Sequence, residues 1–483
     1  MGLRDRPAGR SPRRTLRIAA LALCLLTLLS AGHSALTYDP VVRASPPGTG
    51  PPGEPLVVAT VDGVGPGQIV AYDADGDVVY RDDSLFLYHD VDPSPAGEHT
   101  MTYVASDGAP PDACGGERCL RNVIERANLT TGEVTRVDSW VHPRNGSTQI
   151  HDVDRINDSA VLVADISFPD RVYVRNTTTG AVTWEWQVSE AYGPESGGAY
   201  PRDWTHINDV ERLPDGRVML SLRNQDQVVF VDPGEGIQPN WTLGTDGDHA
   251  TLYEAHNPDY IPASRGGPAV VIADSENNRL VEYERTNGSW ERTWVWRDAT
   301  MQWPRDADRL PSGRTLAVDT HGQRIVSVAP DGRIAWSRSL PTGGYDVELL
   351  GTGDESAGGH AAAALDLRSR RPTTPLVDGN TSMRDATVGP SLAGNGSAAS
   401  GGNGTTGDGS GAMARGLAAP VSTLGYLVVS LVPPLVLHGV LYALPSWATA
   451  VDATLLIATL LVAGCWLVAA VAVRVGPRLR SSG

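Results

Sequence analysis

The stretch WTHINDVERLPDGRVMLSLRN, residues 204–224, reads as one hairpin of an all-β protein. It opens with a polar phrase, His206-Ile207-Asn208-Asp209, that leads into a β run. Pro214-Asp215-Gly216 has the composition of a tight turn, in which proline presets φ and glycine accepts a positive φ. Val218–Leu222 then shows the two-residue alternation of a strand, and we expect Arg223 to lie on this same strand, about one rung from His206. The stretch therefore predicts a strand, a turn and a returning strand.

Turns that end in glycine recur through the chain. They are Asp75-Gly76, Thr131-Gly132, Thr179-Gly180, Glu235-Gly236, Asn287-Gly288 and Asp331-Gly332. Their glycines lie 56, 48, 56, 52 and 44 residues apart, which is the length of four short strands with loops. A period of this size is typical of a propeller. We therefore expect an all-β, six-bladed β-propeller within residues 50–370.

Six polar phrases mark the starts of these repeats. They are His89-Asp90, His151-Asp152, His206-Ile207-Asn208-Asp209, His256-Asn257-Pro258-Asp259, Arg305-Asp306 and Tyr345-Asp346. The last start has no turn after it, and the first turn has no start before it, so one blade should combine both chain ends and close the ring. Inner strands of a propeller surround a central channel. Four histidines and one arginine should therefore meet there.

The charge balance limits the partners of this chain. It has 483 residues, of which 41% are apolar, and 56 acidic against 39 basic residues give a net charge of −17. The basic residues are all arginine. This acidic excess argues against a nucleic-acid partner, and it is typical of proteins adapted to high salt.

Apolar segments at both ends predict export and a membrane anchor. Residues 1–35 hold six arginines and then the apolar run Ile18–Leu29, typical of a signal peptide or signal anchor. Residues 378–415 have the Gly/Ser/Asn-rich composition of a flexible linker. Residues 421–475 contain two apolar segments long enough to span a lipid bilayer. We expect a protein of the cell membrane whose propeller is extracytoplasmic.

The topology of these segments stays open. If all three apolar segments span, then Arg474, Arg478 and Arg480 end outside, against the positive-inside tendency. A re-entrant segment broken at Pro433-Pro434 would remove the conflict.

Cys114 and Cys119 are the two cysteines outside the apolar segments. An oxidising exterior favours a small-loop disulfide between them, and two free thiols are the alternative. The acidic loop Asp73–Asp77 has the spacing of a calcium loop, but it coincides with a blade turn, and turn chemistry explains it better.

A set of phrases in fixed order resembles the arylsulfotransferase family, exported enzymes that move a sulfuryl group between phenols without a nucleotide donor. The phrases are Trp204-Thr205-His206-Ile207-Asn208, Leu213-Pro214-Asp215-Gly216, Ser221-Leu222-Arg223-Asn224, Trp241-Thr242-Leu243-Gly244, His256-Asn257 and Asn277–Tyr283. The resemblance covers roughly residues 57–356. It implies a six-bladed propeller with a histidine nucleophile in its channel, an aryl sulfate donor and a phenolic acceptor. No cofactor is expected.

Carried over residue by residue, the resemblance makes His256 the sulfated histidine. It makes His206, Asn208 and Arg223 supporting groups, and His151 the histidine of an earlier blade. His249 lies close enough in sequence to compete with His256, which we prefer because it opens a strand run.

The chemistry favours the same residue types. A neutral imidazole can attack sulfur, and a sulfohistidine divides one hard transfer into two easier ones. His206 or His151 can protonate the leaving phenoxide. Arg223 and Asn208 can hold the sulfuryl oxygens, with Arg305 as a second cation. We interpret His89 and His321 as structural.

Two other functions remain open. His151, His206 and His256 could supply three imidazoles to a metal ion, although a nearby arginine disfavours a dication. The repeats could also build a binding or scaffold module without catalysis.

Overall fold

The computed structural model describes residues 12–37, 56–61, 67–94, 99–116, 119–143, 150–352, 358–370, 383, 429, 432–444 and 448–480. The chain divides into two compact units. One unit spans residues 39–408 and contains all the strands, and the other combines residues 1–38 with residues 409–483.

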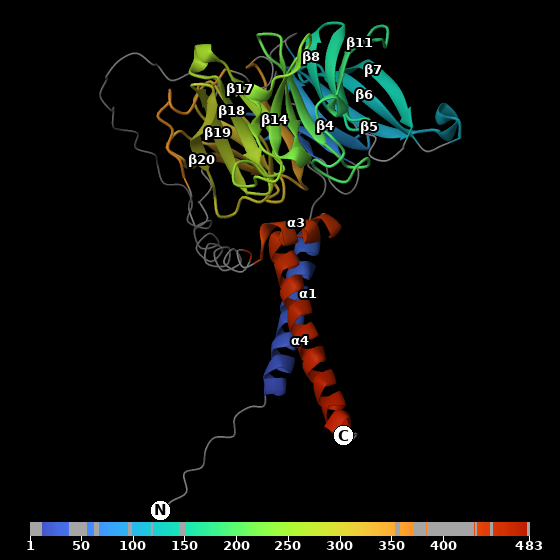
Figure 1. The fold of residues 1–483 in the computed structure, drawn as a ribbon, viewed down its shortest axis with the longest axis vertical. Helices are drawn as coiled ribbons and strands as arrows, with labels where there is room; N and C mark the ends of the chain where they lie inside the picture. The colour runs from blue at the N-terminus through green and yellow to red at the C-terminus, as the bar shows by residue number, and fades with distance from the viewer. Residues whose placement is uncertain are drawn as a thin grey trace, which may run out of the picture. The chain divides into compact units, whose positions relative to one another are not determined.

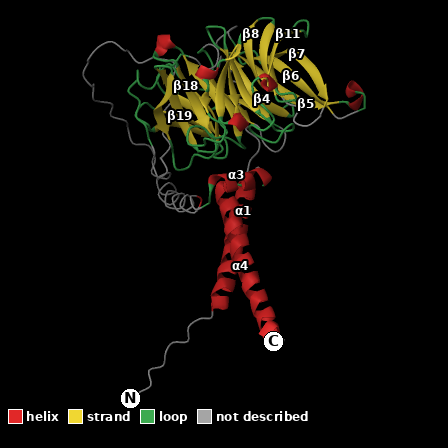
Figure 2. Cartoon of the chain, viewed as in Figure 1, coloured by secondary structure: helices red, strands yellow, loops and turns green. Residues whose placement is uncertain are grey.

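Six antiparallel sheets form the larger unit (Figures 1 and 2), and we name them blades A to F, each from its innermost strand outward. Blade A has β25 (Gly344–Leu349), β1 (Val57–Val61), β2 (Gln68–Tyr72) and β3 (Val78–Asp82); blade B has β4 (Leu87–Pro93), β5 (Thr100–Ala109), β6 (Cys119–Asn128) and β7 (Glu133–Pro143). Blade C has β8 (Ile150–Asn157), β9 (Ala160–Asp165), β10 (Arg171–Asn176) and β11 (Val182–Gln187).

Blade D has β12 (Ile207–Arg212), β13 (Val218–Leu222), β14 (Gln227–Asp232) and β15 (Gly236–Ile237), with β16 (Leu243–Gly244) also paired to β14. Blade E has β17 (His256–Ile261), β18 (Ala269–Asp274), β19 (Arg279–Thr286) and β20 (Ser289–Trp296); blade F has β21 (Pro304–Arg309), β22 (Thr315–Asp319), β23 (Arg324–Val328) and β24 (Ile334–Ser339). Short 3-10 helices are η1 (Pro111–Cys114), η2 (Val188–Glu190), η3 (Arg223–Gln225), η4 (Pro239–Trp241) and η5 (Ala263–Arg265). The predicted six-bladed propeller is confirmed.

Blade A closes the ring from both chain ends. Its innermost strand β25 pairs antiparallel with β1, and Val57 lies opposite Leu349. The predicted closure is therefore confirmed. Because β25 and β1 each satisfy the backbone groups of the other, neither chain end leaves an open sheet edge inside the ring.

Carboxylates on the inner strands connect each blade to the next one. In every case an inner-strand carboxylate accepts a hydrogen bond from a backbone N–H of the following inner strand. The pairs are Asp346–Val91 (2.7 Å), Asp90–Val153 (3.2 Å), Asp152–Val210 (2.5 Å), Glu211–Tyr260 (3.2 Å), Asp259–Arg309 (2.9 Å) and Asp306–Val347 (3.0 Å). All six blade interfaces carry such a bond. The inner acidic residues thus hold the ring together around the channel.

Each inner strand also carries a β-bulge near its start. The register of the inner pair shifts across His89 in blade B, His151 in blade C, Asn208 in blade D, Asn257 in blade E, Arg305 in blade F and Tyr345–Asp346 in blade A. A bulge leaves one residue unpaired and turns its side chain away from the regular pleat. The bulges therefore determine which side chains face the channel.

Tryptophans fill the spaces between blades. Trp336 on β24 is fully buried and packs against Val57 and Val70 of blade A. Trp296 on β20 packs with Ala317 and Val326 of blade F, and its indole N–H donates to the Gly332 carbonyl.

Two smaller predictions have local structural counterparts. Cys114 and Cys119 form a disulfide at the tip of the β5–β6 hairpin, with 6.2 Å between their Cα atoms. In the acidic loop, the Asp73 carboxylate accepts the backbone N–H groups of Asp75 and Asp77, so it stabilises the turn itself.

The smaller unit consists of helices, α1 (Pro12–Thr37), α3 (Pro434–Ala443) and α4 (Ala450–Arg480). Within the described residues, two stretches are long and apolar enough to cross a membrane, Arg17–Leu36 and Ala450–Val468. The segment predicted over 421–444 is described at residues 429 and 432–444, where it forms the ten-residue helix α3. The predicted linker, residues 378–415, lies outside the described residues except for Met383.

Candidate active site

The starts of the inner strands bring a cluster of rings together at one mouth of the channel. The ring centroid of His151 lies 5.3 Å from that of His89 and 4.9 Å from that of His206. Tyr345 is the hub of this cluster, with centroids 5.8 Å from His89, 5.8 Å from His151 and 6.3 Å from His256. These histidine and tyrosine rings come from five blades and form one site, which we call the channel mouth.

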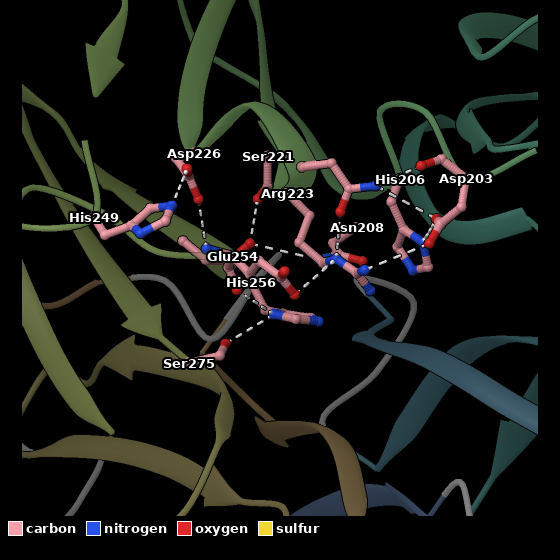
Figure 3. A network of polar contacts seen from close by, with 12 residues as sticks. Asp203, His206, Asn208, Ser221, Arg223, Asp226, His249, Glu254, His256 and Ser275 are labelled. Atoms are coloured by element: carbon pink, nitrogen blue, oxygen red, sulfur yellow. Dashed lines mark hydrogen bonds and ion pairs between the residues drawn. The ribbon is translucent and has the colours of Figure 1, made fainter. Parts of the chain in front are cut away.

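His256, the first residue of β17, is buried, and its Nδ1 atom has two neighbours. Nδ1 lies 3.0 Å from the carbonyl oxygen of Glu254 and 2.8 Å from the hydroxyl of Ser275 (Figure 3). A carbonyl oxygen only accepts hydrogen bonds, so Nδ1 carries the proton and donates it. In the neutral ring, Nε2 then holds the free lone pair.

The backbone just before His256 is held by blade D. The Ala255 carbonyl accepts hydrogen bonds from the Ser221 hydroxyl at 2.8 Å and from the Asn208 side-chain amide at 3.4 Å. Ser221 lies on β13 and Asn208 on β12, so two neighbouring strands fix the start of β17. Asn208, predicted to bind substrate, thus contacts the strand that carries His256, and its own side-chain oxygen is buried without a hydrogen-bond partner in the described structure.

His206 lies directly before β12 with a left-handed backbone, φ 52°. Its Nδ1 atom is 2.5 Å from the carboxylate of Asp203. The same carboxylate lies 3.7 Å from the guanidinium of Arg223, which is also 3.5 Å from Glu254. Arg223 was expected on the strand paired with His206, but β13 ends at Leu222 and Arg223 opens η3. It therefore points beyond the sheet, with two carboxylates balancing its charge.

Arg305 lies between two aromatic rings. Its guanidinium carbon is 4.5 Å from the ring centroid of Trp303 and 4.6 Å from that of Tyr345. Stacking of this kind holds the planar guanidinium in one orientation. The hydroxyl of Tyr345 in turn lies 2.8 Å from Nδ1 of His151. Blades A, C and F are thereby linked at the channel mouth.

Burial keeps the three central imidazoles neutral near pH 7. Burial, and next Arg223, lower the pKa of His206 to about 4, although Asp203 opposes this shift. Burial and then Arg305 hold the pKa of His256 well below its usual range. The pKa of His151 is lowered in the same direction by burial and by His206. A neutral imidazole is the form that can act as a nucleophile or base.

His249 lies apart from the rings of the channel mouth. It is half exposed, its Nε2 is 3.3 Å from the carboxylate of Asp226, and its ring stacks on Tyr253 at 3.7 Å. Figure 3 shows it on the far side of Glu254 from the His206–Asp203 pair. His249, Tyr253 and Arg223 line a polar cavity of about 340 Å³ that opens beside the channel mouth.

The described residues contain no group of three or more His, Cys, Asp or Glu side chains arranged to hold a metal ion. The rings of His256 and His206 instead contact Ser275 and Asp203 (Figure 3), and the ring of His151 contacts Tyr345.

Several site residues escaped the sequence analysis, among them Asp203, Ser275 and Tyr345. Tyr345 occupies the blade-start position that holds histidine in other repeats, and this alignment was the available signal. Asp203 lies three residues before His206, and Ser275 follows β18, so neither belongs to a repeated phrase. Their contacts arise from loop geometry.

The fold and site define the class of protein, a β-propeller with an imidazole and guanidinium cluster at one mouth of its channel. Residues 56–257 match the family model for arylsulfotransferase (ASST). Over this range the chain is therefore similar to the arylsulfotransferase family, and the resemblance seen in the sequence is confirmed. A comparison with curated proteins gave no match.

Solved structures with some likeness include a Bacteroides caccae protein of unknown function, at 12% identity and TM-score 0.44, covering 62% of this chain and 100% of that one. Another is the periplasmic gluconolactonase of Pseudomonas aeruginosa, at 15% identity and TM-score 0.42, covering 61% of this chain and 98% of that one.

Proposed function

We propose that the channel mouth transfers a sulfuryl group from an aryl sulfate ester to a phenol through a sulfated His256. The family match supports aryl sulfotransferase activity in general. The observation that carries the finer proposal is the Nδ1 contact of His256 with the Glu254 carbonyl. This contact selects the tautomer whose Nε2 lone pair is free to attack.

In the first half-reaction, Nε2 of His256 attacks the sulfur of the donor. An N–S bond forms while the S–O bond to the aryl oxygen breaks, and the phenoxide leaves with the bonding electron pair. His206 gives the phenoxide a proton, since a sulfuryl anion beside this imidazole favours its protonated form. The Glu254 carbonyl and the Ser275 hydroxyl stabilise the positive charge that develops on the His256 ring.

In the second half-reaction, the acceptor phenol gives its proton to Nε2 of the neutral His206. The phenol oxygen attacks sulfur, the N–S bond breaks, and its electron pair returns to Nε2 of His256. His206 then holds the proton that the next leaving phenoxide takes, so protons balance over the cycle. Arg223 and Arg305 stabilise the charge spread over the sulfuryl oxygens in both transition states.

The first test follows sulfuryl incorporation by mass. The purified protein is incubated with 4-nitrophenyl sulfate, and the peptide containing His256 is expected to gain one sulfuryl group. His256→Ala should abolish both this gain and transfer to a phenol. His249→Ala is the matched control, and it should retain both.

The other outcomes distinguish the competing functions. If sulfuryl incorporation persists in His256→Ala and is lost in His249→Ala, the nucleophile is His249 and not His256. Absence of incorporation and turnover in the wild-type protein would favour a binding module. Stoichiometric metal in the active protein, with activity lost on chelation, would favour the three-imidazole metal site.

We also propose that this reaction takes place outside the cytoplasm on a membrane-anchored protein. The terminal apolar stretches Arg17–Leu36 and Ala450–Val468 support an anchor. Fractionation is the test, since the full chain should sediment with membranes and its sulfotransfer should be accessible to a donor added to intact cells.

A further inference from the structure

A buried carboxylate in the helical unit has more hydrogen-bond donors than its own helix supplies. Asp452, in the first turn of α4, is 4% exposed. One of its oxygens, Oδ2, accepts the backbone N–H and the hydroxyl of Thr449, both at 2.9 Å. This is the arrangement of a helix cap, and it leaves the other oxygen, Oδ1, without a donor from α4.

Helix α1 supplies the missing donors. The hydroxyl of Ser30 donates to Oδ1 of Asp452, and the hydroxyl of Ser34 donates to Oδ2 at 2.7 Å. Farther along, the hydroxyls of Thr27 and Thr459 meet at 2.9 Å. From the Asp452 contacts to the Thr459 contact, residue numbers rise along α4 but fall along α1, from Ser30 and Ser34 to Thr27. The two helices therefore pair antiparallel. Figure 1 shows α1 in blue beside α4 in red.

We infer that α1 is a retained membrane anchor, paired with α4 through Asp452, and not a signal peptide that is removed on export. In a lipid bilayer, an ionisable side chain faces a protein partner because lipid offers it no hydrogen bonds. Serine and threonine hydroxyls commonly provide such contacts between membrane helices. Removal of α1 would take away the hydroxyls of Ser30 and Ser34, the two described donors that reach Asp452 from a distant part of the chain.

Charge also agrees with a two-helix anchor. With α1 and α4 as an antiparallel pair, the six arginines of residues 4–17 and the three of residues 474–480 lie on the same side of the membrane. This satisfies the positive-inside tendency that three spans would violate. The described part of the apolar segment between α1 and α4 agrees with two spans rather than three, because α3 begins at Pro434 and has ten residues. A helix of that length is about 15 Å long, half the hydrocarbon core. The inference is independent of the proposed sulfotransfer.

Two measurements on the full chain purified from membranes test the retained anchor. Digestion after arginine should release the peptide 18–43, which contains both serines. Its absence, with a new N-terminus inside that range, would overturn the inference.

The second measurement is oxidative cross-linking in a Cys24→Ser, Cys465→Ser background. Thr27→Cys combined with Thr459→Cys should form an intramolecular disulfide, and adding Ser30→Ala and Ser34→Ala should reduce its yield. The matched control combines Leu28→Cys with Leu461→Cys, whose parent side chains are 71% and 65% exposed, and it should not cross-link. An intact N-terminus without the Thr27–Thr459 cross-link would refute the pairing.

Discussion

The hydroxyl of Ser275 lies 2.8 Å from Nδ1 of His256, on the side of the ring away from Nε2. Both residues are buried, and the same Nδ1 atom contacts the Glu254 carbonyl. The His256 ring is therefore oriented by groups on its Nδ1 side, away from the Nε2 atom that attacks in the proposed mechanism. In that mechanism sulfation at Nε2 would make the ring cationic, so these contacts would strengthen as the reaction proceeds.

Ser275→Ala should lower kcat for sulfotransfer by about tenfold or more, because a hydrogen bond to a charged group contributes about 1.5–3 kcal/mol. KM should change little, since Ser275 contacts the Nδ1 side of the His256 ring and the proposed mechanism places the donor at Nε2. Single-turnover kinetics of His256 sulfation would measure the effect. Ser159→Ala, in an exposed turn of blade C, is the control, and an unchanged kcat in Ser275→Ala would show that the Glu254 carbonyl alone orients the ring.

Asp203 and His206 form the second polar pair of the site. The hydrogen bond that His206 Nδ1 donates to Asp203 raises the pKa of His206 against the larger lowering by burial and Arg223, and the resulting pKa is about 4. Asp203→Asn removes the one opposing charge, so the pKa should fall further. The acidic limb of kcat/KM for the acceptor phenol, whose proton His206 takes in the proposed second half-reaction, should then move to lower pH.

Because His206 would be a weaker base in Asp203→Asn, the rate of sulfotransfer at neutral pH should also fall, by about tenfold to a hundredfold. The measurement is the pH profile of transfer from 4-nitrophenyl sulfate. Asp246→Asn removes another carboxylate of the neighbouring cavity without touching a histidine, and its profile should match the wild type. An acidic limb that moves to higher pH in Asp203→Asn would contradict this role.

Arg305 is held as a flat cation between Trp303 and Tyr345. Arg305→Lys keeps the charge but loses the stacking and the fork of donors, so KM for the aryl sulfate should rise severalfold. Arg305→Ala should raise KM by about tenfold or more, as expected for a lost charge-assisted contact.

Initial-rate kinetics with varied donor would measure both effects. Arg217→Lys is the matched control, because Arg217 stacks at 3.7 Å on Trp241 away from the channel histidines. Equal KM values in the Arg305 variants and the wild type would remove Arg305 from donor binding.

The fold could be predicted from the sequence because its signals are local. A glycine such as Gly332 has φ 82° and is required by its turn alone, whatever the blade packs against. The spacing of such turns gave the number of blades, and the unmatched first turn and last start gave the pairing of β25 with β1.

The site could be predicted only in part, because its geometry depends on register and loops. Nothing in the sequence near His151 indicates a bulge, since the extra residue exists only relative to β9. The contacts of the Ala255 carbonyl with Ser221 and Asn208 cross a blade interface, which no local pattern encodes. Arg223 was expected one rung along a strand, but the strand ends before it.

The ring of inner carboxylates gives the propeller a distinct pH dependence. Burial raises the pKa of Asp152 to about 7, and it raises that of Asp346 to about 6. Unfolded, both groups titrate near pH 4. Between these values the folded state holds more protons than the unfolded state, so the free energy of unfolding falls as pH rises through this window.

Asp152→Asn should flatten this dependence. Asparagine can still accept the hydrogen bond from the Val210 N–H but does not ionise. From about pH 4 to about pH 7, the Tm of the wild type should fall more than that of the variant, by about 2 °C for each 1 kcal/mol of linkage. Calorimetry across this range is the measurement. Asp215→Asn, in an exposed turn, is the control and should keep the wild-type slope. If the Tm of Asp152→Asn depends on pH as steeply as that of the wild type, the Asp152 carboxyl titrates equally in the folded and unfolded states. The other carboxylates of the ring would then cause the pH dependence.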